Sequence, residues 1–207
     1  MTRALDRGYH HRKMSWSVAL SILANLFPLA GVLFLGWDIA AVLFLYWAES
    51  AVIGFYNVVK MLTAKSGLVP SQKAFFVGFF MVHYGLFMFV HLVFLTVILS
   101  KGLSVPGFGL QTFAVIRTGL LMLFLSHGSA FFLQYLGKGE YRTASEKLLL
   151  IQPYGRIVIM HLTIVFGTAI FWISGRRLSL LVLLVLMKIV ADVGAQLILK
   201  PRAVVAV

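Results

Sequence analysis

The chain has 207 residues, of which 61% are hydrophobic and 12% are charged, and its formal net charge is +12. Soluble domains carry about 25% charged residues and about 45–50% apolar residues, so a water-soluble fold of this length could not bury so much apolar surface. The absence of cysteine excludes disulfide bonds, thiolate metal ligands and a cysteine nucleophile. The lysines and arginines stand at the ends of apolar runs, which indicates a membrane surface as their partner and excludes nucleic acid.

Six apolar runs predict an all-α fold: a polytopic bundle of about six transmembrane helices, forming a single domain over residues 1–207. A helix that crosses a bilayer takes about 20 predominantly apolar residues. In chain order, the predicted helices cover residues 15–36, 38–62, 73–99, 112–136, 153–174 and 177–199. The first run is longer than a signal-peptide core of about 7–15 residues, so we expect it to be a retained helix.

The first two predicted helices are joined by almost no loop. Pro28 is expected to kink the first, which lipid tolerates when neighbouring helices satisfy the freed carbonyl group. The second carries Glu49 in mid-span, where a carboxylate must be protonated, paired or bound to a cation. Asn57, two turns further on, is expected to donate a hydrogen bond to a neighbouring helix.

The third and fourth helices contribute histidines. His83 and His91 lie eight residues apart in the third helix, about 12 Å along its axis. Residues 101–110 contain three glycines and a proline and predict a loop. His127 lies in the fourth helix.

The last two helices carry further ionisable residues. His161 lies in the fifth helix, for which an interfacial lead-in from Ser145 is an open alternative. Lys188 and Asp192 lie four residues apart in the sixth, a spacing that allows an ion pair on one helix face.

The distribution of lysine and arginine predicts the orientation, because these residues are enriched in cytoplasmic loops. Twelve of the 18 lie on the side that holds both termini and the loops after the second and fourth helices, and three lie on the other side. Both termini are therefore expected in the cytoplasm. The remaining three, Arg117, Arg156 and Lys188, lie within predicted helices.

Several of the ionisable residues lie at one predicted depth. An ionisable residue at mid-bilayer costs about 2.5–3.5 kcal/mol, so it is expected to face the bundle interior. At a rise of about 1.5 Å per residue from the cytoplasmic helix ends, the following residues lie about 12–17 Å deep: Glu49, His83, His127, His161 and Asp192. His91 is expected apart from them, nearer the outer surface.

Imidazole and carboxylate groups that converge from four helices are ligands suited to zinc, iron, copper or nickel. We therefore predict a metal site of Glu49, His83, His127 and His161, with Asp192 as a further ligand or as an orienting group. Haem ligation between two helices is an alternative. The leading hypothesis is an intramembrane metal-binding protein, which leaves a metalloenzyme or a redox protein open.

Two other functions remain open. One is a small proton- or ion-coupled transporter that uses Glu49, Lys188 and Asp192. The other is a structural membrane protein whose polar residues only join helices. Neither His-Glu-x-x-His nor Gly-x-Ser-x-Gly occurs in the sequence, so whether the chain is an enzyme stays open. The lipid bilayer is the expected partner; the substrate stays unknown, and a homo-oligomer is among the alternatives.

The run Tyr46-Trp47-Ala48-Glu49-Ser50-Ala51-Val52-Ile53-Gly54-Phe55-Tyr56-Asn57 resembles the second-helix motif of an uncharacterised bacterial integral-membrane family, known only as a domain of unknown function. His83-Tyr84-Gly85 and the run from Lys188 through Ala191 and Asp192 are similar to it as well. The resemblance implies a six-helix protein of the bacterial inner membrane and supplies no activity, substrate or site.

Overall fold

The computed structural model describes residues 26, 28–102, 110–175 and 178–198, and these form helices joined by short loops, without a strand. Residues 28–34 are helical. The later elements are α2 (Ile39–Thr63), α3 (Pro70–Gly102), α4 (Leu110–Ala130), the π-helix η1 (Phe131–Leu136), the 3-10 helix η2 (Glu140–Arg142), α5 (Glu146–Ile151), α6 (Tyr154–Ser174) and α7 (Leu178–Ile198). The predicted all-α bundle is confirmed.

Four spans in the described part of the chain are long and apolar enough to cross a membrane: Ile39–Thr63, Pro70–Val97, Phe113–Leu136 and Glu146–Gly167. Many large apolar side chains on their outer faces are exposed, as expected for a surface that lipid covers. The protein is therefore a membrane protein. The count of six spans stays a prediction, because most of the first run lies outside the described residues and the described apolar stretch of α7, Leu181–Val190, is shorter.

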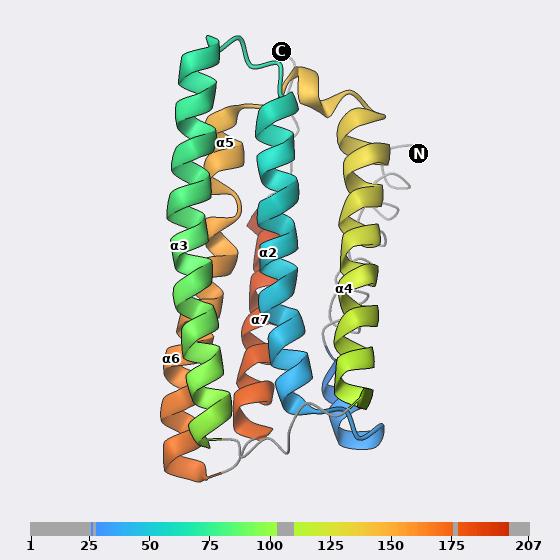
Figure 1. Cartoon of the computed structure of the whole chain (residues 1–207), viewed down its shortest axis with the longest axis vertical. Coiled ribbons are helices and arrows are strands. Elements are labelled where there is room, and N and C mark those ends of the chain that lie inside the picture. Colours follow the sequence, from blue (N-terminus) through green and yellow to red (C-terminus); the bar gives the residue numbers. More distant parts are fainter. Residues whose placement is uncertain (1–25, 27, 103–109, 176–177, 199–207) are drawn as a thin grey trace, which may run out of the picture.

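Helix α2 is the centre of the bundle and contacts α3, α4, α5, α6 and α7 (Figure 1). Its first turn is capped by Asp38, whose carboxylate accepts a hydrogen bond of 2.9 Å from the Ala40 N–H. At the other end, Lys73 Nζ donates to the carbonyl groups of Leu62 and Ala64, at 3.1 and 2.6 Å. Side chains thus satisfy one of the unpaired N–H groups at the start of α2 and carbonyl groups at its end.

The fifth predicted helix, residues 153–174, corresponds to α6, but the apolar span to which it belongs begins earlier in the chain. Helix α5 ends at Ile151, a turn covers Gln152 and Pro153, and α6 begins at Tyr154. Together they make one apolar span that begins at Glu146, not at Pro153. The lead-in from Ser145 is thus part of the span. Every residue of α6 therefore lies seven residues further from the start of the span than predicted, which is about 10 Å at the helical rise.

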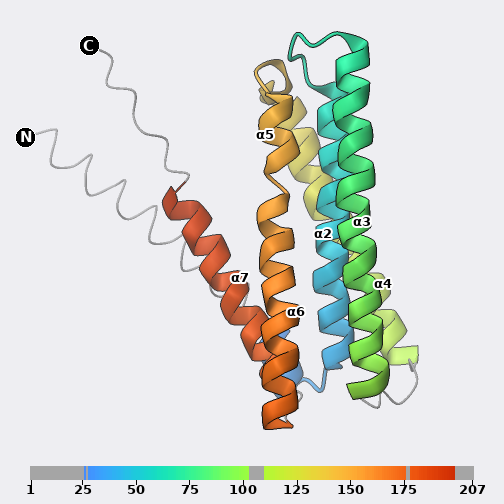
Figure 2. The same ribbon diagram turned by 90° about the vertical axis from the view of Figure 1, so that its left-hand side faces the viewer.

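Helix α7 leans away from the other helices. It starts beside the end of α6, packs mainly on α6, and diverges from the bundle along its length (Figure 2). The loops after α2 and η1 meet at the opposite end, where the Lys65 N–H donates to the Tyr141 carbonyl at 2.7 Å. Basic residues that the sequence assigns to one side of the membrane, such as Lys65 and Arg142, therefore do lie at one end of the bundle.

Candidate functional site

The run Tyr46–Asn57 of α2 reaches most of the neighbouring helices. Trp47 Nε1 donates to the Met88 carbonyl of α3 at 2.9 Å, and Tyr56 Oη donates to the Phe124 carbonyl of α4 at 3.1 Å. Each of these bonds joins a side chain of α2 to the backbone of another helix. The motif that carried the family resemblance therefore organises the bundle.

Asn57 makes the interhelical bond expected of it, and the Pro153 break explains its partner. The Gln152 N–H donates to the Leu148 carbonyl in the ordinary helical pattern, at 2.9 Å. Pro153 has no N–H, so the next carbonyl, of Leu149, lacks its helical donor. Asn57 Nδ2 donates to it instead, at 2.8 Å.

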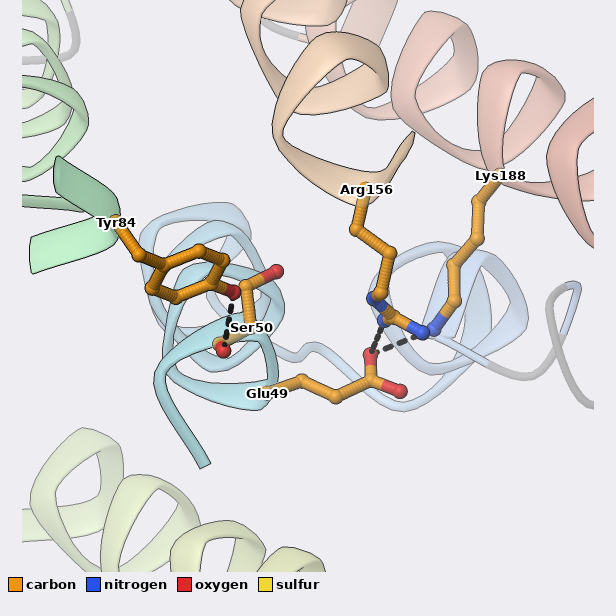
Figure 3. Close-up of polar contacts among 5 residues, drawn as sticks. All are labelled: Glu49, Ser50, Tyr84, Arg156 and Lys188. Atoms are coloured by element: carbon orange, nitrogen blue, oxygen red, sulfur yellow. Dashed lines mark hydrogen bonds and ion pairs between the residues drawn. The ribbon is translucent and has the colours of Figure 1, made fainter. Parts of the chain in front are cut away.

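Glu49 points from α2 toward α6 and α7, away from the side where Tyr84 bonds Ser50 (Figure 3). Its Oε2 atom lies 2.9 Å from Arg156 Nη2 and 2.8 Å from Lys188 Nζ. The side chains of Glu49, Arg156 and Lys188 are 17%, 26% and 22% exposed. We call these three residues the Glu49 triad. One carboxylate thus meets two cations from two other helices, well inside the membrane-crossing part of the bundle.

Sequence reasoning missed Arg156 because it placed the start of the span at Pro153. Counted from there, Arg156 lies three residues in, at the membrane surface, where arginine is ordinary. Counted from Glu146, it lies ten residues in, about 15 Å deep and level with Glu49. The signal that would have revealed it is the apolar run that precedes Pro153.

A cavity of about 360 Å³ adjoins the triad between α2, α4 and α7. Glu49 and Lys188 are part of its wall, and Lys188 Nζ also lies 5.2 Å from the centre of the Tyr46 ring. Most of the remaining wall is apolar, and it includes Leu45, Met122, Leu123, Leu184 and Val185. The site is therefore an apolar chamber with charged groups on one wall, the usual form of a small-molecule pocket.

The predicted metal ligands take separate contacts. His83 Nδ1 lies 2.7 Å from Tyr154 Oη, and its ring stacks on Phe79. The His161 ring contacts that of His91, with 5.5 Å between ring centres. His127 lies within electrostatic range of Glu49.

Within the described residues, no three His, Asp or Glu side chains form a group that could hold a metal ion. The four-ligand site of Glu49, His83, His127 and His161 stays a prediction.

Two expectations about single residues can be compared with the structure. The placement of His91 apart from the other histidines is wrong, because the shift of about 10 Å along α6 brings His161 to its level. The pairing of Lys188 with Asp192 stays a prediction: Lys188 pairs with Glu49, and the Asp192 side chain lies outside the described part of α7.

The sequence can now be placed among known proteins. A family of unknown function, DUF6498, matches residues 9–204. The chain belongs to this family. No curated protein and no solved structure matches it.

Membership in DUF6498 confirms the resemblance that the α2 run suggested, and it covers nearly the whole chain. It assigns no chemistry. The structure of this family member adds what the pattern alone lacked: the α2 run is where the interhelical hydrogen bonds and the Glu49 triad come together.

Proposed function

We propose that this DUF6498 protein is a small proton-coupled carrier that binds an amphiphilic organic anion at the Glu49 triad. The observation that carries the proposal is the pairing of one carboxylate with two cations beside an apolar cavity. Among the functions that the sequence left open, this arrangement favours the transporter.

The two cations define the charge of the ligand. Lys188 Nζ donates to Glu49 Oε2 at 2.8 Å, and Arg156 Nη2 forms an ion pair with the same oxygen at 2.9 Å. Hydrogen bonds between charged groups contribute about 1.5–3 kcal/mol each, so a carboxylate or sulfonate is the natural competitor for this position. Glu49 then acts as the anion that holds the empty site together.

Proton coupling follows because a bound anion separates Glu49 from its two cationic partners. A carboxylate displaced from both cations into an apolar wall is costly as an anion and becomes neutral by taking up a proton. The cluster then holds two cations, one bound anion and one neutral acid. Its net charge is the same as before, so one anion and one proton enter the membrane interior together without added charge.

The cavity defines the rest of the ligand. Its volume of about 360 Å³ is at the small end of the range of about 300–1,000 Å³ typical of ligand pockets. Its apolar walls favour a short alkyl or aryl group attached to the charged end. A straight-chain acid of medium length has both parts.

The orientation belongs to the same proposal. We place both termini, and the end of the bundle that holds Lys65 and Arg142, in the cytoplasm of a bacterial inner membrane. The excess of lysine and arginine at that end supports this placement.

A transport assay in proteoliposomes tests the proposal. Radiolabelled octanesulfonate is a suitable probe, because it keeps its negative charge at all accessible pH values and does not cross the bilayer as a neutral acid. We expect uptake driven by an inwardly directed proton gradient. The double substitution Arg156→Gln/Lys188→Gln should lower uptake at least about tenfold, since it removes two charged contacts.

Lys138→Gln is the matched control, because it removes one positive charge from an exposed loop. Octanol should not compete with the probe, whereas octanoate should. Uptake that persists in the Arg156/Lys188 variant, or that falls equally in the Lys138 variant, would refute a role for the triad.

A further inference from the structure

The pair formed by His91 of α3 and His161 of α6 has no role in the proposed carrier. His91 is 1% exposed, one of the most buried polar side chains of the bundle. Its Nδ1 lies 2.6 Å from the Phe87 carbonyl, one turn earlier in α3. Because a carbonyl accepts, Nδ1 carries the proton in this bond, and the neutral ring presents a lone pair at Nε2.

The Nε2 atom of His91 is buried and has no hydrogen-bond partner among the described residues. A buried acceptor left in this state is unfavourable, because it has lost its hydrogen bonds to water without gaining others. Metal-binding histidines commonly show this combination, in which one nitrogen donates to a backbone carbonyl and the other is left for the ion. The burial of His91 therefore calls for a partner at Nε2.

The position of His161 fits a shared ion. The two ring centres are 5.5 Å apart and the ring planes make an angle of 85°. In a metal site the ring centre lies about 3.2 Å from the ion, because the metal–nitrogen bond is about 2.0–2.1 Å and the ring adds a little over 1 Å. Two such rings at a ligand–metal–ligand angle of about 110–120° have centres about 5.2–5.5 Å apart. The observed separation lies at the upper end of this range.

We propose that His91 and His161 hold a divalent transition-metal ion between α3 and α6. Imidazole nitrogen suits zinc, copper, iron and nickel, and no redox step is implied. Described His, Asp and Glu side chains supply no third ligand, and His161 lies on the exposed side of the pair. The remaining coordination positions are therefore left to ligands other than these side chains. This site is independent of the Glu49 triad and of the proposed transport.

Metal titration of the full-length protein in detergent tests the site. All variants carry His10→Ala and His11→Ala, because these neighbouring histidines are themselves potential ligands. Co²⁺ absorption and elemental analysis of Zn²⁺-loaded protein should give about one ion per chain. His91→Phe and His161→Phe keep a ring at each position and remove the nitrogen donors, and each should weaken Co²⁺ binding at least tenfold.

Thr96→Val is the control, since Thr96 lies in the same helix and its hydroxyl donates to the Val93 carbonyl instead. Its metal affinity should be unchanged. X-ray absorption of the Zn²⁺-loaded parent gives a result that does not depend on variants, and it should show imidazole scattering from two rings. Absence of saturable binding, absence of that scattering, or equal affinity in the His91 and Thr96 variants would overturn the proposal and leave the pair as an aromatic contact.

Discussion

Glu49 is expected to contribute more to stability than Arg156 or Lys188, because both cations pair with this one carboxylate. Removing Lys188 leaves the bond from Arg156, and removing Arg156 leaves the bond from Lys188. Removing the carboxylate leaves both cations without it. Breaking a buried ion pair from one side costs up to about 3–5 kcal/mol, and partial exposure of these side chains lowers that figure.

We therefore expect Glu49→Gln to destabilise the protein more than Arg156→Gln or Lys188→Gln, by about 1–2 kcal/mol. Thermal unfolding in detergent measures the order of the three variants. Added octanesulfonate should restore part of the stability of Glu49→Gln, since the anion takes the place of the carboxylate. A Glu49→Gln variant as stable as Lys188→Gln would show that the triad contributes little.

Gly54 of α2 is the position against which the Tyr84 ring of α3 packs. A Cβ atom at Gly54 would lie 2.5 Å from Tyr84 Cε1. The Tyr84 ring is 4% exposed and is held by its bond of 2.8 Å to the Ser50 carbonyl, so it has little room to move. Close packing of this kind makes added volume destabilising.

Gly54→Ala should cost about 1–3 kcal/mol of unfolding free energy. Gly78→Ala is the control on α3, where nothing lies within 4 Å of the added Cβ. That substitution should be neutral or stabilising by up to about 1 kcal/mol, because alanine favours helix. Equal effects of the two substitutions on the melting temperature would contradict the close contact.

At the scale of elements, the break between α5 and α6 and the side chain of Asn57 form one unit. Asn57 donates to the carbonyl that Pro153 leaves without a helical donor. Asn57→Leu should cost about 1–3 kcal/mol, because it leaves the Leu149 carbonyl unsatisfied. In a Pro153→Ala background the new N–H of residue 153 can donate to the Leu149 carbonyl, so Asn57→Leu should lower the unfolding free energy by less.

A double-mutant cycle measures this coupling, with both single variants, the double variant and the parent unfolded under one condition. Gln152→Ala in place of Pro153→Ala is the control, since it leaves the donor pattern unchanged. Additive losses at Asn57 and Pro153 would exclude the compensation.

The same elements show what the sequence could and could not predict. Apolar runs gave the helices of the described chain within a few residues, because lipid imposes length and composition directly. Pro153 misled the prediction of the fifth span, since a proline usually ends a helix but here interrupts a continuous apolar run. That error moved Arg156 to the surface and separated His91 from His161, so both side-chain groupings were missed. Glu49 and Asn57 were identified from their positions within an apolar run, because a polar residue there needs a partner.

For the whole molecule, the distribution of charge predicts the topology. Reporters fused after Val207 and near Gly67 should be active in the cytoplasm, and one near Gly107 should report the other side. The Lys65–Tyr141 bond already joins the two basic loops at one end of the bundle. An even number of spans places both termini on the same side. A C-terminal reporter found outside would therefore show that the number of spans is odd or that the N-terminus is not cytoplasmic.

In the proposed carrier, an organic anion displaces Glu49 from Arg156 and Lys188, and Glu49 then takes up a proton. The most direct measurement is the number of protons taken up from a weakly buffered, near-neutral solution when purified protein binds octanesulfonate, which cannot itself be protonated. We predict about one proton per bound anion for the parent protein, and binding without proton uptake for Glu49→Gln. Binding to the parent without proton uptake, or equal uptake by Glu49→Gln, would refute proton coupling at Glu49.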